Sequence, residues 1–174
     1  MTEVANGVRF IPGQDEFIPD SHVYVLGDPA SQDLSLVDAG LVGKGQYKMA
    51  AIRQMGIDPS AVKRVIMTHT HLDHIGCLPE ILQQIPGVEL WVQTLEAEQL
   101  EQGDERTVHG MEMFRSMAEM QFGVKPGDFK FQVQRKLEGS ETLDIGGMTW
   151  EVIHIPGHSM GGIALYNRPQ KILI

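Results

Sequence analysis

The sequence has little of several features that whole classes of protein require. Its 174 residues include one cysteine, Cys77, so an internal disulfide is excluded. Lys and Arg number 14 against 23 Asp and Glu, and the formal charge of −9 provides no basic field for a nucleic-acid backbone. No apolar run reaches about 18 residues, the length of a membrane span. No N-terminal stretch resembles a signal peptide, so a cytoplasmic protein without nucleic-acid or membrane partners is expected.

The length, with 42% hydrophobic and 21% charged residues, predicts one globular domain over residues 1–174. Runs rich in Val, Ile, Leu and Tyr predict strands at 8–12, 22–27, 34–37, 62–67, 88–92, 129–133, 141–145, 149–155, 163–166 and 171–174. Helices are expected at 44–55, 76–85, 95–102, where Thr94 is the expected cap, and 106–122. This order predicts an α/β sandwich with mixed sheets.

The expected helix 106–122 is apolar over much of its circumference. One stripe consists of Met111, Phe114, Met117 and Ala118, and another of Met113, Met117 and Met120. Such a helix is buried on two sides, either inside a larger fold or as a lid or partner surface, for example in a homodimer. Methionine suits the second interpretation because its side chain adapts to varied apolar ligands.

The strongest chemical signal is the stretch 68–74, with three imidazoles and one carboxylate. If the strand 62–67 stays extended to His71, then His69 and His71 project to one side and can meet one metal. Asp73 and His74 fall in the turn before the next helix and can point to a second metal. Two metals about 3.5–4 Å apart can share a water whose pKa falls toward about 7. These ligand types match zinc or iron rather than calcium.

The stretch His-Thr-His-Leu-Asp-His at 69–74 resembles the signature of the metallo-β-lactamase superfamily, which includes glyoxalase II-like metal-dependent hydrolases. The stretch Ile-Pro-Gly-His-Ser-Met-Gly-Gly at 155–162 is similar to the second metal-ligand loop of that family. The resemblance implies an αββα sandwich, two mixed β-sheets flanked by helices. It also implies these roles: His69, His71 and His158 for the first metal, Asp73 and His74 for the second, and Asp38 and His154 as neighbours of the ligands.

The family pattern continues with a bridging aspartate and one more histidine, and neither occurs before Ile174. Five of the seven implied ligands are therefore present. The chain ends in the apolar strand 171–174, which needs a covered position in a sheet. We therefore expect a protein truncated before the bridging aspartate, and we expect the stretch 1–174 alone to be inactive.

The resemblance predicts hydrolysis of a small ester, thioester or lactone by a metal-bound hydroxide. Asp73 would orient the hydroxide and take up its proton as it attacks the carbonyl. Zinc is the expected cofactor, with two ions in the complete protein, and iron or manganese are alternatives. Three other interpretations stay open: a mononuclear iron persulfide dioxygenase, an inactive metal-binding fragment, and a serine hydrolase. The last rests on Ser159, because Gly-His-Ser-Met-Gly at 157–161 satisfies the nucleophile-elbow pattern.

Overall fold

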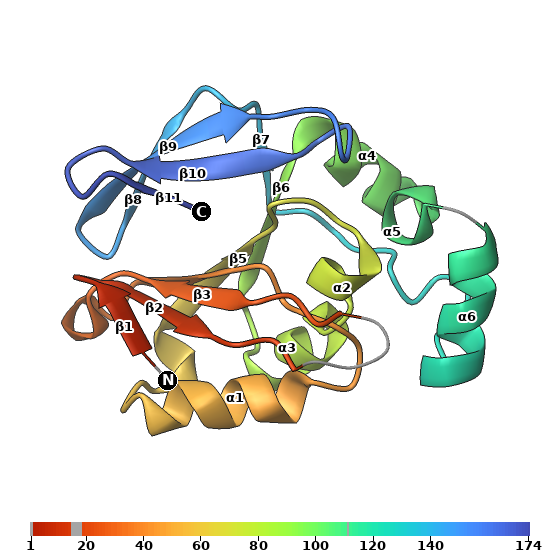
Figure 1. Ribbon diagram of the computed structural model, residues 1–174, viewed down its shortest axis with the longest axis horizontal. Helices are drawn as coiled ribbons and strands as arrows, with labels where there is room; N and C mark the ends of the chain where they lie inside the picture. The colour runs from red at the N-terminus through yellow and green to blue at the C-terminus, as the bar shows by residue number, and fades with distance from the viewer. Residues whose placement is uncertain (1, 15–18, 111) are drawn as a thin grey trace.

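The computed structural model describes residues 2–14, 19–110 and 112–174, which fold around two β-sheets (Figure 1). Seven strands form the larger sheet in sequence order: β1 (Thr2–Ala5), β2 (Val8–Ile11), β3 (Val23–Leu26), β4 (Leu34–Val37), β5 (Val62–Ile66), β6 (Glu89–Gln93) and β7 (Arg135–Leu137). Neighbours from β1 to β4 are antiparallel, and neighbours from β4 to β7 are parallel. The larger sheet is therefore mixed, as predicted.

The smaller sheet has the strand order β11 (Ile172–Leu173), β10 (Ile163–Asn167), β9 (Met148–His154) and β8 (Thr142–Ile145). All of its neighbours are antiparallel, so the prediction of a second mixed sheet is wrong. The hairpin between β8 and β9 turns at Gly146 and Gly147, whose φ angles are 54° and 79°. A tight turn with two positive φ angles matches the twist of antiparallel strands.

The helices lie between β4 and β7 in the sequence: α1 (Gly45–Gln54), α2 (Leu72–Ile75), α3 (Leu78–Gln84), α4 (Thr94–Gln102), α5 (Arg106–His109) and α6 (Glu112–Phe122). In Figure 1, α1 and α3 cover the outer side of the larger sheet, and α4, α5 and α6 lie at one end. The sandwich architecture is thus confirmed. The described helices are all too short or too polar to cross a membrane.

Two hydrophobic cores lie on the two faces of the larger sheet. Leu36 and Val65 belong to the core under the helices, whereas their neighbours Val37 and Ile66 belong to the core between the sheets. Side chains of a strand alternate between faces, so β4 and β5 contribute to both cores at once. Trp150 of β9 is fully buried in the core between the sheets. Both central strands are therefore fixed from both sides where they approach the histidine stretch.

The predicted strand 129–133 is wrong, because the strand in this region is β7. Phe129 and Val133 are buried in the core under the helices, and Phe131 packs against it. Their period of two imitates a strand, but pairing with β6 begins only at Gln134, whose N–H donates to the carbonyl of Leu90 at 3.0 Å. The alternation of apolar residues at 129–133 therefore reflects burial, while the backbone hydrogen bonds of the strand begin a few residues later.

The predicted continuous helix 106–122 is also wrong, because it breaks between α5 and α6. Gly110 ends α5 with a φ of 68°, a conformation that glycine adopts without steric cost. Met111, from one predicted stripe, lies outside the described residues. Thr94 is not the cap of α4 either: it is the first helical residue, and the side chain of Gln93 accepts a hydrogen bond from the N–H of Leu95.

A buried ion pair fastens the loop before β3 onto α1. Lys48 Nζ lies 2.9 Å from Asp20 Oδ2, and both side chains have no exposed surface. Lys48 also donates to the carbonyl of Ser21, and the N–H of Ser21 donates to the carbonyl of Asp73 at 3.2 Å. Asp20 Oδ1 accepts the N–H of Leu41 at 2.8 Å. The pair therefore connects α1 to the histidine stretch.

Replacing Lys48 by Met is expected to lower the free energy of unfolding by about 3 kcal/mol, because the carboxylate of Asp20 stays buried without its cation. The measurement is urea unfolding. The matched control is Arg168→Ala, which breaks the exposed pair with Glu151 and should cost no more than about 1 kcal/mol. Equal losses in the two variants would contradict the role of the buried pair.

Candidate metal centre

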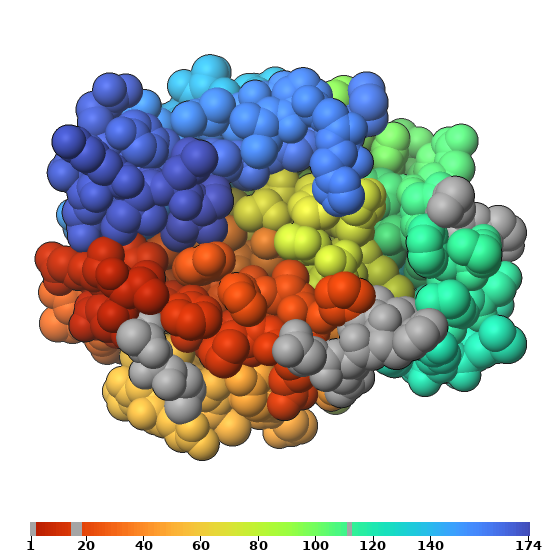
Figure 2. Space-filling model, in the orientation of Figure 1, coloured from red at the N-terminus to blue at the C-terminus, as the bar shows by residue number. Residues whose placement is uncertain are grey.

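Two loops meet at one edge of the sandwich. The first follows β5 and carries the histidine stretch, and the second connects β9 to β10 and carries His158. The carbonyl of Thr68 accepts the N–H of Ile163 at 2.8 Å, so the two loops are joined by backbone as well as by side chains. Figure 2 shows the β9–β10 loop (blue) beside the histidine loop (yellow) on one face of the molecule.

Three histidine side chains converge from these loops. His71 Nδ1 lies 2.9 Å from His158 Nε2. The ring centroid of His69 is 4.7 Å from that of His71 and 4.9 Å from that of His158. One ring nitrogen of each histidine lies within 4.8 Å of the others, which is the one group of three or more such ligands among the described residues. His71 and His158 are 87 positions apart in the sequence, so only folding brings them together.

The chemical state of these rings fits a divalent metal. His69 Nε2 is buried and has no hydrogen-bond partner among the described residues. Burial, and then the neighbouring imidazoles of His74, His71 and His158, lower the pKa of His69 to about 3. Burial and His158 also lower the pKa of His71. Neutral imidazoles present lone pairs, and an unpaired buried nitrogen needs a partner, so the arrangement suits zinc or a similar ion.

Asp38 connects the end of β4 to this site. Its Oδ1 accepts the N–H of Thr68 at 2.7 Å, and its Oδ2 lies 2.8 Å from His74 Nδ1. The backbone of Asp38 has a φ of 64°, which aspartate tolerates better than most residues. Burial disfavours the charged ring of His74, but the hydrogen bond and charge of Asp38 outweigh it and raise the pKa of His74. Asp38 thus orients both the loop and one ring.

The structure places the two predicted second-metal ligands next to each other. His74 Nε2 lies 3.5 Å from Asp73 Oδ2, and the ring of His74 lies 4.0 Å from that of His69, measured between centroids. His74 Nδ1 is engaged by Asp38, which leaves Nε2 facing Asp73. Neither residue belongs to the group of three histidines. Their role as ligands therefore stays a prediction.

His154 ends β9 and Ser159 lies in the loop that follows it, but neither completes a catalytic group with its neighbours. His154 Nε2 lies 2.9 Å from the carbonyl of Met160 and holds the loop closed. Ser159 Oγ has no hydrogen-bond partner among the described residues. A nucleophile elbow needs a helix after the serine, whereas the strand β10 follows here. The serine-hydrolase interpretation therefore lacks its required geometry.

Glu96 of α4 is a site residue that sequence reasoning missed. Its carboxylate is buried, with 1% of the residue exposed. Oε2 accepts the hydroxyl of Thr70 at 2.8 Å, and Oε1 accepts the N–H of Gly161 at 3.1 Å. Thr70 stands between two of the histidines and Gly161 follows the third, so one carboxylate joins both ligand loops. The available signal was a charged residue on the buried face of α4, with Ala97 and Leu100.

Comparison with known proteins agrees with this geometry. Residues 19–174 match the family model of the metallo-beta-lactamase superfamily. The chain therefore belongs to the metallo-β-lactamase superfamily, and the fold predicted from the histidine motifs is confirmed.

Individual relatives are distant. The probable metallo-hydrolase YqgX of Bacillus subtilis is 28% identical over 76% of this chain and 55% of its own length. The hydroxyacylglutathione hydrolase GloC of Haemophilus influenzae is 24% identical over 81% and 58%. The acyl-coenzyme A thioesterase MBLAC2 of Bos taurus is 27% identical over 83% and 53%. The chain thus spans little more than half the length of these relatives.

Solved structures show the same fold. A metallo-β-lactamase of Cronobacter sakazakii with an HARLDQ motif superposes with a TM-score of 0.70. The superposition covers 94% of this chain and 58% of that one at 21% identity. At this identity the likeness shows the architecture alone.

Replacing Glu96 by Ala should leave the Thr70 hydroxyl and the Gly161 N–H without their acceptor. We expect a loss of about 2–4 kcal/mol in unfolding free energy and a zinc affinity weaker by about tenfold or more. Urea unfolding and competition with a chromophoric chelator measure the two effects.

The conservative Glu96→Gln keeps one acceptor oxygen and should lose less. Glu98→Ala removes an exposed carboxylate from the same helix and is the control. If Glu96→Ala matched Glu98→Ala in both stability and zinc affinity, Glu96 would not position the loops.

The lowered pKa of His69 makes the metal-free protein sensitive to acid. Below pH 6.5 the unfolded chain takes up a proton at His69 that the folded chain does not bind, so folding stability falls as the pH falls. In His69→Asn this loss is absent. After allowance for partial exposure, we expect the variant to gain about 1 kcal/mol relative to the wild type between about pH 7.5 and 5. Urea unfolding after chelator treatment tests this, and a constant difference across the pH range would contradict it.

Proposed function

We propose that the protein containing this chain is a metal-dependent hydrolase of acyl thioesters or related esters. The observation that carries the proposal is the cluster of His69, His71 and His158, which brings three imidazole rings together in one place. The cluster borders an open cavity of about 550 Å³, into which Asp38, His74 and Ser159 also face. A small carbonyl substrate has room to reach the histidines through this cavity.

His69, His71 and His158 would hold the first metal, and Asp73 and His74 would contribute to a second. A divalent metal at this position lowers the pKa of a bound water and polarises a carbonyl oxygen. The chain's own groups then act around the reacting atoms. Asp73 accepts the proton that the attacking water loses, and the ring of His74 lies beside it, with Nε2 3.5 Å from Asp73 Oδ2. Asp38 keeps the ring of His74 in place through Nδ1.

Two of the relatives support thioesters as the substrate class. GloC is named for hydrolysis of hydroxyacylglutathione, and MBLAC2 is named an acyl-coenzyme A thioesterase. Both substrates carry an acyl group on a thiol. Zinc is the proposed cofactor because three imidazoles suit it, and iron remains the metal of the alternative reaction, persulfide oxidation.

The test uses the full-length protein and thioesters of N-acetylcysteamine, with the released thiol measured. Chelation should abolish turnover and zinc should restore it. Mutation of a residue that only supports a metal ligand typically lowers activity about 10–100-fold. His158→Ala removes a proposed ligand itself and should lower kcat/KM by more than that. Ser159→Ala, on the same loop, is the matched control and should retain activity.

Several results would contradict the proposal. Turnover that survives chelation, or that falls with Ser159→Ala while persisting in His158→Ala, would remove the metal from the reaction. One iron per chain together with oxygen consumption on persulfides would assign the dioxygenase reaction instead.

A further inference from the structure

A second cleft, lined mainly by apolar residues, also borders the histidine cluster. Its volume is about 780 Å³. The carbon-rich wall comes from three helices: Leu72 of α2, Val108 of α5, and Phe114 and Met117 of α6. Figure 1 shows α5 and α6 at the end of the molecule beyond α2, and in Figure 2 α6 (turquoise) forms the edge of this face. Three separate helices thus contribute apolar side chains to one hollow.

The same cleft reaches the proposed reaction centre. His71, Asp73 and His158 line it together with the apolar wall. Leu72 lies between two of these residues in the sequence, so the wall begins within the ligand loop itself. A substrate whose carbonyl lies at the histidines therefore has the apolar wall directly beside it.

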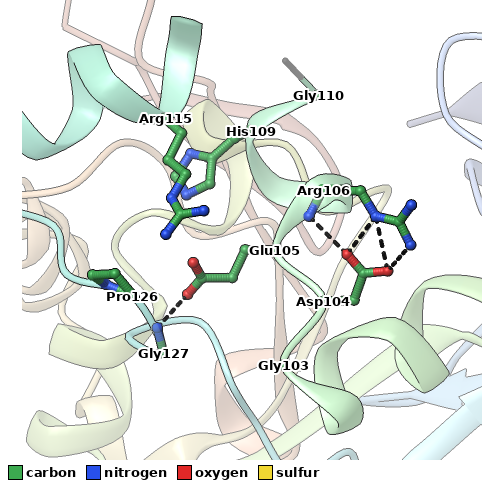
Figure 3. Close-up of a pocket in the computed structure, with 9 residues that line it drawn as sticks. All are labelled: Gly103, Asp104, Glu105, Arg106, His109, Gly110, Arg115, Pro126 and Gly127. Atoms are coloured by element: carbon green, nitrogen blue, oxygen red, sulfur yellow. Dashed lines mark hydrogen bonds and ion pairs between the residues drawn. The ribbon is translucent and has the colours of Figure 1, made fainter. Parts of the chain in front are cut away.

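The wall is held in place from two sides. Thr107 Oγ1 of α5 lies 2.5 Å from Thr70 Oγ1, which ties the helix to the histidine loop. On the opposite side, the carboxylate of Glu105 accepts the N–H of Gly127 at 2.7 Å (Figure 3). The ring of His109 packs edge-on against Phe129, with centroids 5.9 Å apart. These contacts fix the α5 part of the wall before binding, so that part costs little ordering entropy when a ligand arrives.

The residues that line the cleft suit the acyl chain of a thioester better than a charged thiol carrier. The described residues of the cleft include no Lys or Arg, so nothing there pairs with the carboxylates or phosphates of a large thiol carrier. Charged residues line a separate polar pocket of about 310 Å³ instead: Asp104, Glu105, Arg106 and Arg115 (Figure 3). An uncharged aliphatic chain is the ligand that suits the cleft.

We propose that this cleft binds the aliphatic acyl chain of the substrate, so that Phe114 and Met117 set a preference for medium-length straight-chain acyl groups. This inference rests on the proposed thioester hydrolysis. Phe114 is 43% exposed without a ligand, so a chain lying against it gains apolar contact. Met117 is half-buried and flexible, which lets the wall adapt to chain length.

The size of the expected preference follows from burial. Removing one methylene from water changes an equilibrium about fourfold. Because the cleft is open on one side, we expect kcat/KM to rise about two- to fourfold per methylene until the cleft is filled.

The first experiment compares acetyl, butyryl, hexanoyl, octanoyl and decanoyl thioesters of N-acetylcysteamine on the zinc-loaded full-length protein. Phe114→Gln and Met117→Gln should each lower the ratio of octanoyl to acetyl kcat/KM at least fivefold. The matched control is Met120→Gln, because Met120 lies on the same helix, is 81% exposed and does not line the cleft. A flat chain-length profile, or an equal change in the control, overturns the cleft proposal while thioester hydrolysis itself stands.

A second experiment does not depend on turnover. Binding of 1-octanol and of ethanol to the metal-free protein is measured by calorimetry, with the same three variants. The proposal requires tighter binding of octanol, weakened at least threefold by Phe114→Gln and unchanged by Met120→Gln. If no thioester is hydrolysed but octanol binds in this pattern, the proposed function fails and the apolar site remains. If octanol binds no better than ethanol, the site fails.

A second copy of the chain is the competing occupant. Sedimentation of wild type and Phe114→Gln distinguishes it. A dimer that Phe114→Gln dissociates, with an unchanged chain-length profile, would assign the wall to a subunit interface and overturn the acyl proposal.

Discussion

The site depends on the hydrogen bonds that the carboxylate of Asp38 accepts from Thr68 and shares with His74. Asp38 stands at the end of a strand whose side chains lie in both cores, so its position is fixed by most of the fold. From there it binds the backbone and hydroxyl of Thr68 and the ring of His74. The carbonyl of Thr68 also accepts the N–H of Ile163, which belongs to the other sheet. Asp38 and Thr68 therefore connect the two sheets through hydrogen bonds.

Three imidazoles held this close together need surrounding groups to fix their positions. Burial depresses the pKa of His69, and His69 Nε2 has no hydrogen-bond partner. Two carboxylates, those of Asp38 and Glu96, fix the loops from opposite sides. Each is nearly buried and each binds backbone N–H groups as well as hydroxyls. Such charge-assisted contacts keep the ligands in place before the metal binds.

The hydrogen bonds of Thr70 also connect the histidine loop to the helix that lines the apolar cleft. Glu96 and Thr107 both bind the hydroxyl of Thr70, so the ligand loop and α5 are parts of one network. The helix that carries Val108 is therefore bonded directly to the histidine loop. In the proposed enzyme, the group that positions the metal ligands thus also positions the wall beside them.

The sequence by itself determined the architecture and the ligand candidates, because alternating apolar residues report strands and the histidine spacing is a local pattern. The predictions of a strand at 129–133 and of a continuous helix at 106–122 were wrong. Apolar periodicity indicates which residues are buried, but it shows neither which backbone groups pair nor that the helix breaks at Gly110. Only the tertiary structure decided that Glu96 joins the two loops and that Phe114 lines a cleft beside the site. Those contacts join residues far apart in the chain, and no local pattern encodes them.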